Sequence, residues 1–137
     1  MRKTFLFVLA SLCLTGCSSI QVCRDFKGVA IEGQQHPIAT IAAENYGYYL
    51  FGFIPLITGN PGQPERNDCF WFRDTVTVQN NMRMVANAAR REHGDALANV
   101  KTTTSFDGSF SFWIVFRKII FTSAVVTGAG QPKGKER

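Results

Sequence analysis

Cysteine is the residue type in this sequence with the widest chemistry open to it, and its four copies lie in different surroundings. A thiolate can act as a nucleophile, form a disulfide, take a covalent group or bind a metal ion. Cys13 lies inside an apolar run that ends at Leu14, whereas Cys17 follows the small residues Thr15 and Gly16. These surroundings predict different chemistry for the thiols of Cys13 and Cys17.

The segment before Cys17 is typical of a bacterial lipoprotein signal. Arg2 and Lys3 precede ten mostly apolar residues, Phe5 to Leu14, which are too few to span a bilayer. The tetrad Leu14-Thr15-Gly16-Cys17 resembles a lipobox, in which small residues admit a peptidase and the cysteine thiol then takes the lipid. We expect removal of residues 1–16 and attachment of the protein to a lipid bilayer through acylated Cys17. An ordinary secretory signal that contains a cysteine is the alternative.

The mature chain would hold 121 residues beginning at Cys17, enough for one domain with a core. Ser18 rather than Asp follows the lipid site, which in enteric-type sorting favours the outer membrane, facing the periplasm. Without the two cations of the signal, 13 basic and 10 acidic residues remain, and three of the cations lie within residues 133–137. The basic pI thus comes mostly from the cations near the C-terminus, and we expect no nucleic-acid partner.

Cys23 and Cys69 form an even pair in a chain expected to reach an oxidising compartment, so we predict a disulfide between them. Two free thiols or a metal site are the alternatives. A metal site would need further ligands, and only His36 and His93 offer imidazoles, without close spacing. We therefore expect no metal and no cofactor.

The sequence contains no complete catalytic motif. It has no Gly-x-Ser-x-Gly and no phosphate-binding glycine loop. Asp68, Asp74 and Asp95 could in principle pair, but Asp74 and Asp95 fit roles in helix capping or turns. His93 is expected in the last turn of a helix, where it acts as a capping residue. We therefore expect a protein that is not an enzyme.

The elements expected around these residues define an α+β fold, with a small mixed or antiparallel sheet, one main helix packed on it and a C-terminal β-hairpin. Residues 17–27 are expected to form a lipidated tether, residues 28–127 a single domain and residues 128–137 a disordered basic tail. Short apolar runs at 29–31 and 38–43 are candidate strands, although the alanines of the second also allow a helical turn.

The aromatic segment from Tyr46 to Ile57 is predicted to be an irregular buried strand. Gly47 and Gly52 would mark bends or a close approach of two backbones. The alternative is an exposed surface that contacts lipid or a partner, because large apolar patches usually have that role.

The next stretch, residues 58–68, has the composition of a surface loop. A helix then begins at an N-cap, Asp74 or, as the second choice, Thr77, and ends at His93-Gly94 with Gly94 as the left-handed cap. Its expected apolar face consists of Val78, Met82, Val85, Ala86 and Ala89. The expected partner contacts are on the loop and on the polar side of the helix: Asn60, Gln63, Arg83, Arg90 and Arg91. A solvated helix face is the alternative for the arginines.

Asp107-Gly108 has the sequence of a two-residue hairpin turn, which would place Thr104 opposite Ser111 and Thr102 opposite Trp113. The strand after the turn, expected over residues 109–126, is apolar on both faces. That pattern predicts a central place in the sheet.

Two parts of the chain resemble known bacterial proteins. The helix that leads through Gly94-Asp95-Ala96 into a strand at Val100 is similar to the small α/β module of RcsF-type and YbjQ-type proteins. The run from Asn45 to Pro55, followed by Gly59-Asn60, resembles small uncharacterised TRL-like lipoproteins. Together these resemblances cover about residues 37–127, and they imply fold and location more than activity.

The combined expectation is a lipid-anchored lipoprotein of the cell envelope with a structural or protein-interaction role, and with an envelope protein as partner. An envelope stress sensor that acts by contact with another envelope protein is the first alternative. RcsF-like sensors carry four cysteines in the folded domain, whereas this chain offers two. A peptidoglycan-acting enzyme is the least favoured alternative.

Overall fold

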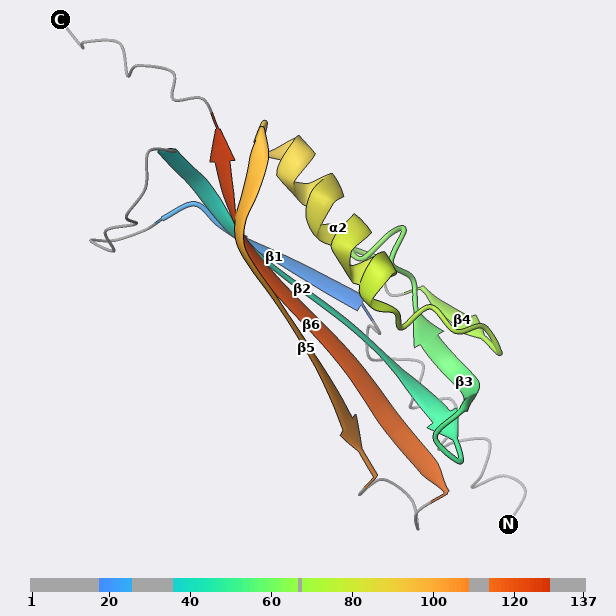
Figure 1. Ribbon diagram of the computed structural model, residues 1–137. Helices are drawn as coiled ribbons and strands as arrows, with labels where there is room; N and C mark the ends of the chain where they lie inside the picture. The colour runs from blue at the N-terminus through green and yellow to red at the C-terminus, as the bar shows by residue number, and fades with distance from the viewer. Residues whose placement is uncertain (1–17, 26–35, 67, 109–113, 129–137) are drawn as a thin grey trace, which may run out of the picture.

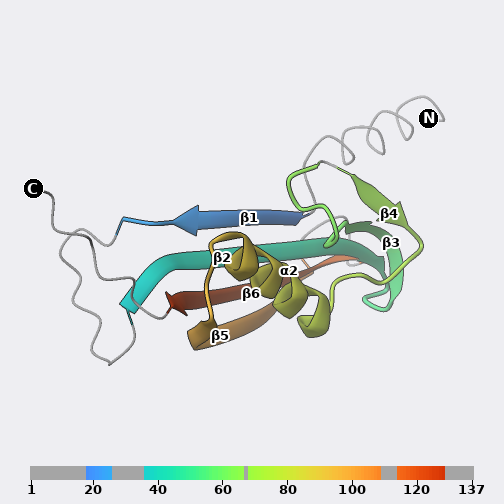
Figure 2. The ribbon, with the colours of Figure 1, turned by 90° about the horizontal axis from the view of Figure 1, so that it is seen from above.

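The computed structural model describes residues 18–25, 36–66, 68–108 and 114–128, which form one antiparallel sheet and one helix (Figure 1). The strands run in the order β4-β3-β2-β6-β5, and β1 also pairs with β2. Helix α2 covers one face of the sheet (Figure 2). The expected α+β class is confirmed, with a sheet of six strands. The elements are β1 Ser18–Cys23, β2 His36–Leu50, β3 Ile54–Gly59, β4 Cys69–Trp71, α2 Val78–Arg91, β5 Ala96–Asp107 and β6 Val115–Gly128.

Strand β2 organises the sheet because both of its edges are paired. Along one edge, β6 pairs with it from His36 to Leu50. The other edge is shared: β1 pairs from Ser18 opposite Asn45 onward, and β3 pairs up to Thr58 opposite Gly47. Strands β1 and β3 therefore lie end to end. The expectation of a tether is wrong for residues 18–23, because their backbone hydrogen bonds are made to β2.

The face of α2 that packs on the sheet differs from the predicted one. The buried helical residues are Asn81, Met84, Val85, Ala88 and Ala89, whereas Val78 is 47% exposed and Met82 is half-buried. Ile41, Ala43 and Ala124 of the sheet complete this core. The prediction used apolar residues alone. It could not identify Asn81, a polar residue of the face that is actually buried.

The N-cap of α2 is the second choice of the sequence analysis, and the predicted left-handed residue at its other end is wrong. Thr77 is the N-cap, and its hydroxyl accepts a hydrogen bond from the backbone N–H of Asn80 at 3.2 Å. At the other end His93, not Gly94, takes the left-handed conformation, with φ of 56°. The N–H groups of His93 and Gly94 bond to the carbonyls of Arg90 and Ala89, which is a Schellman motif. Gly94 serves a different purpose, because a Cβ there would lie 2.0 Å from Cγ1 of Val126.

The C-terminal hairpin of β5 and β6 is present, but its predicted register is wrong. Thr102 lies opposite Thr122 and Thr104 opposite Ile120, rather than opposite Trp113 and Ser111. The strands separate after Asp107 pairs with Arg117, so the connection is longer than two residues. The predicted central place of β6 is confirmed, since it lies between β2 and β5.

The aromatic segment forms a hairpin between β2 and β3 rather than one irregular strand. Phe51 and Gly52 occupy its turn with φ of 54° and 81°. Tyr49 and Ile57 are buried, whereas Phe51 and Phe53 are 57% and 73% exposed. The expected close approach at Gly47 is confirmed, because a Cβ there would lie 2.7 Å from Cγ2 of Thr58.

Several expectations lie outside the described residues: the signal and Cys17, the apolar run at 29–31 and the tail beyond Gly128. Within the described ranges, no helix has the length and apolarity that crossing a membrane requires.

A buried amide joins three parts of the fold. Asn45 is fully buried; its Oδ1 accepts a hydrogen bond from Ser18 Oγ at 3.0 Å, and its Nδ2 donates to the Thr75 carbonyl at 2.8 Å. Thr75 in turn donates to the Gly59 carbonyl at 2.6 Å. Asn45 thus ties β1, β2 and the segment before α2 at the point where β1 and β3 meet.

Replacing Asn45 with Ala should destabilise the domain by about 2 kcal/mol. It leaves the buried Ser18 hydroxyl without its partner, and it removes one of the two hydrogen bonds that the Thr75 carbonyl accepts, the other coming from Asn80 Nδ2. Chemical denaturation of the purified mature protein measures this loss. Thr40→Ala on the same strand is the control, and it should cost less than about 1 kcal/mol. Equal losses in the two variants would contradict the role assigned to Asn45.

Candidate binding site

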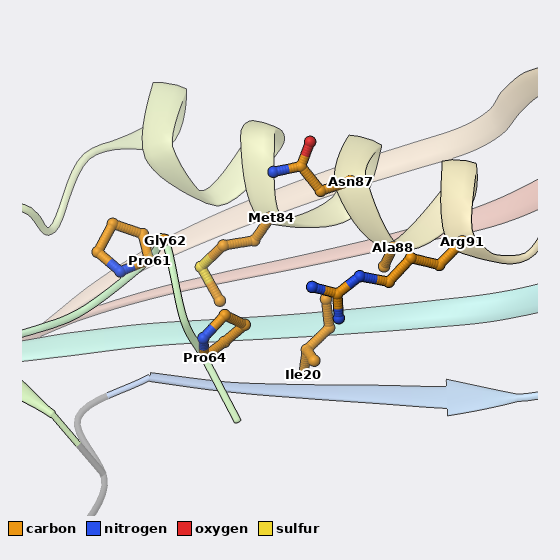
Figure 3. A pocket seen from close by; sticks show the side chains of 8 residues that line it. All are labelled: Ile20, Pro61, Gly62, Pro64, Met84, Asn87, Ala88 and Arg91. Atoms are coloured by element: carbon orange, nitrogen blue, oxygen red, sulfur yellow. The ribbon is translucent and has the colours of Figure 1, made fainter. Parts of the chain in front are cut away.

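A shallow cleft lies where α2, β1 and the loop after β3 meet (Figure 3). It encloses about 240 Å³, including space open to solvent, which is below the volume of most small-molecule pockets. The cleft brings the predicted contact residue Arg91 next to the predicted loop. Its lining consists of Ile20, Pro61, Gly62, Pro64, Met84, Asn87, Ala88 and Arg91.

The loop is ordered by its own side chains, including two that were predicted as partner contacts. Asn60 Oδ1 accepts a hydrogen bond from the Gly62 N–H at 3.0 Å, and the Asn60 carbonyl accepts one from the Gln63 N–H. Gln63 Oε1 accepts a hydrogen bond from Arg66 at 3.1 Å. Asn60 and Gln63 therefore shape the loop, and each already holds an internal partner.

Two ion pairs hold the C-terminal end of α2 to its neighbours. Arg91 contacts Glu65 of the loop at 2.6 Å, with both side chains more than half exposed. Arg24, just after β1, donates to both carboxylate oxygens of Glu92 at 2.7 and 2.8 Å. The Arg24 hydrogen bond lowers the pKa of Glu92, and the same bond raises the pKa of Arg24. Of these four residues, only Arg91 lines the cleft.

Arg83 and Arg90 lie on the exposed side of α2, away from the sheet. They are seven residues apart, two helical turns, so their side chains share one stripe of the helix. Arg90 approaches Asn87 Oδ1 at 3.5 Å, and this polar stripe continues toward Arg91 at the cleft. The arrangement presents positive charge beside an ordered loop.

The predicted disulfide between Cys23 and Cys69 is not formed. Cys23 is an exposed, free thiol paired in register with Thr40, and it donates to the Asp25 carbonyl at 3.4 Å. Cys69 lies opposite Gly59, one strand further out. The strand registers separate the two cysteines by about 20 Å along the sheet, far beyond the reach of a disulfide.

The carboxylates Asp74 and Asp95, considered as a possible catalytic pair, do not assemble into one site. The Asp95 N–H bonds to the Thr127 carbonyl, at the end of the sheet where His36 pairs with Gly128, and this end is remote from Asp74. Asp74 Oδ1 accepts hydrogen bonds from the Tyr49 hydroxyl at 2.6 Å and from the Val76 N–H. Burial and the Asp74 hydrogen bond raise the pKa of Tyr49, which keeps this phenol protonated as a donor. Among the described residues, no group of three acidic, His or Cys side chains could hold a metal ion.

The contacts of Arg24, Glu65 and Glu92 were missed by sequence reasoning. Arg24 and Glu92 are 68 residues apart, and Glu65 and Arg91 are 26 apart. No local pattern predicts such pairs, because exposed charges find each other only after the strands and helix are placed.

No protein family, curated protein or solved structure matches this chain.

Acid should selectively remove the contribution of the Arg24–Glu92 pair. A carboxyl whose pKa is lower in the folded state stabilises the fold above its ordinary pKa, and the contribution is lost as pH falls through the folded value. Arg24→Gln should therefore lower Tm near neutral pH. The difference in Tm between Arg24→Gln and wild type should shrink as the pH falls below about 4, and it should disappear once Glu92 is protonated. Arg83→Gln is the control; a pH-independent Arg24→Gln effect would contradict the assignment.

Proposed function

We propose that this protein is a lipid-anchored lipoprotein of the bacterial cell envelope that acts by binding another envelope protein, without catalysis. The observation that carries the proposal is the tetrad Leu14-Thr15-Gly16-Cys17 behind its short apolar run. The proposed location is the outer membrane, facing the periplasm, because Ser18 follows the lipid site.

The geometry around α2 supports the binding part of the proposal. Arg83 and Arg90 form an exposed stripe on a helix that packs firmly on the sheet, and the loop beside it is held by hydrogen bonds and the Glu65–Arg91 pair. Loops and helices on a rigid scaffold commonly carry recognition. The cleft is small for a substrate, so the favoured ligand is a protein surface with acidic side chains facing the stripe.

The anchor is tested with Cys17→Ser in the full-length chain. Wild-type protein should be shortened by residues 1–16, incorporate labelled palmitate and fractionate with membranes. Cys17→Ser should lose the label, since no acyl chain can then be attached, whatever membrane association its uncleaved apolar run retains. Cys23→Ser is the matched control and should keep both. A Cys17→Ser variant that still labels would overturn the anchor assignment.

The binding surface is tested by charge reversal. The double variant Arg83→Glu with Arg90→Glu should reduce recovery of the crosslinked envelope partner about tenfold, because two attractive contacts become repulsive. Its Tm should stay close to wild type, since both side chains are exposed.

The control for charge reversal places new negative charge on β5, with Lys101→Glu and Thr103→Glu, two exposed positions of that edge strand. This variant should recover the partner normally. Equal recovery by both double variants would exclude the α2 stripe as the contact surface.

A further inference from the structure

The end of the sheet formed by the β2–β3 turn and β4 carries two pairs of exposed aromatic side chains. Phe51 and Phe53 are 57% and 73% exposed, with ring centroids 6.4 Å apart. Trp71 and Phe72 are 46% and 71% exposed, also with centroids 6.4 Å apart. Together with Ile54, we call these residues the aromatic tip. Apolar groups gathered in this way mark a contact surface more often than chance exposure.

The backbone holds two of these aromatics in an unfavourable conformation. Phe51 and Phe72 both have φ of 54°, in the left-handed region that favours glycine. Hydrogen bonds from the Phe51 N–H to the Ile114 carbonyl at 2.7 Å and from the Phe72 N–H to the Leu56 carbonyl at 3.1 Å fix these positions. Strain of this kind persists where the surrounding contacts fix it, and it is common at binding sites. Here it displays large rings outward instead of packing them.

The aromatic tip lies near the place where the chain enters the sheet. Strand β1 begins at Ser18 opposite Asn45 and runs away from the tip (Figure 2). Only the part of β2 from Asn45 to Leu50, about 17 Å long, separates the start of β1 from the β2–β3 turn. Ser18 is 6% exposed and hydrogen-bonded, so no described spacer lies between residue 17 and the fold. A lipid on Cys17 would hold this end of the domain close to the membrane.

The charges near the aromatic tip favour an apolar contact. Arg66 lies 3.7 Å from Asp68 and Arg117 lies 3.9 Å from Glu44, so these cations have acidic neighbours. Arg73 lies over the Phe70 ring at 5.0 Å. A surface that joins aromatic rings to balanced charge suits the interface of a bilayer, where rings enter the acyl boundary and polar groups stay in water.

We propose that the aromatic tip inserts into the interface of the bilayer that anchors the protein, and so fixes the orientation of the domain on the membrane. This inference rests on the proposed lipidation of Cys17. A single acyl chain binds membranes only marginally, and a second contact makes the attachment stable. The binding should be insensitive to salt, because it depends on apolar area rather than charge.

Fluorescence quenching tests the insertion directly. The chain has two tryptophans, Trp71 and Trp113, so Trp113→Phe leaves Trp71 as the only indole. In the acylated protein bound to phosphatidylcholine vesicles, brominated acyl chains should quench Trp71 by about half or more. Unquenched Trp71 in vesicle-bound, acylated protein would overturn the insertion and leave the lipid anchor standing.

A second measurement uses the protein without its lipid. Protein that begins at residue 17 and carries Cys17→Ser should still partition weakly onto phosphatidylcholine vesicles, and adding Phe51→Ser, Phe53→Ser and Phe72→Ser should reduce that partition about tenfold. The matched control changes three exposed apolar residues elsewhere, Val22, Val100 and Phe121, to Ser and should partition normally.

The outcomes separate the two proposals. Absence of lipid on Cys17 would refute the anchor, and the partition of the Cys17→Ser series then decides the insertion alone. Equal partition of the tip and control variants would overturn the insertion. Concentration-dependent dimerisation that disappears in the tip variant would assign the tip to a second copy of the chain, and would overturn the bilayer as its occupant.

Discussion

The buried side chain of Asn45 is the interaction on which the arrangement of this fold depends. One edge of β2 carries two strands, and the place where β3 ends and β1 begins is a weak point in any sheet, because backbone groups there have no regular ladder to complete. Asn45 spans this junction by accepting from Ser18 and donating to the Thr75 carbonyl. An amide is suited to the position because it offers both a donor and an acceptor.

Because of this junction, three parts of the fold keep fixed positions relative to one another: the start of β1, helix α2 and the loop after β3. The chain enters the fold beside Asn45, α2 packs over the same part of β2, and the loop after β3 returns to meet both. The ion pairs of Arg24 with Glu92 and of Arg91 with Glu65 then join the C-terminal end of α2 to the chain after β1 and to the loop. Arg24, Arg91 and Glu65 are more than half exposed, and only the Glu92 side chain is mostly buried. Ion pairs with exposed partners contribute little to stability, so they refine the placement of the helix end rather than drive folding.

The proposed functions use opposite properties of the surface. The stripe of Arg83 and Arg90 offers charge on a regular helix, which suits recognition of an acidic protein surface. The aromatic tip offers apolar rings on two tight turns, which suits a lipid interface. If the tip and the lipid on Cys17 both engage the membrane, the domain has two points of attachment, and the helix is presented in a defined direction instead of rotating about one flexible chain.

Local features of the sequence were sufficient to predict those elements whose structure depends on residues close to one another in the chain. The capping hydroxyl of Thr77, the helix that ends near His93 and the doubly apolar β6 all depend on neighbouring residues. Each of them could be predicted, Thr77 as the second choice after Asp74. The close approach at Gly47 was also predicted, because a glycine inside an apolar strand commonly marks a place where a second backbone comes near. The lipobox tetrad is likewise a local motif, which is why the prediction of an anchor rests on sequence alone.

Only the tertiary structure decided which residues meet across long separations. The register of β5 and β6 depends on packing along both strands rather than on the Asp107-Gly108 dipeptide. The buried face of α2 depends on Asn81, whose amide donates to carbonyls of Ala43 and Ile120 on two neighbouring strands. Cys23 and Cys69 lie apart because β1 and β3 follow one another along one edge of β2. Each of these outcomes arises from pairing between segments that are distant in the sequence. A single sequence does not show which distant segments pair or in which register.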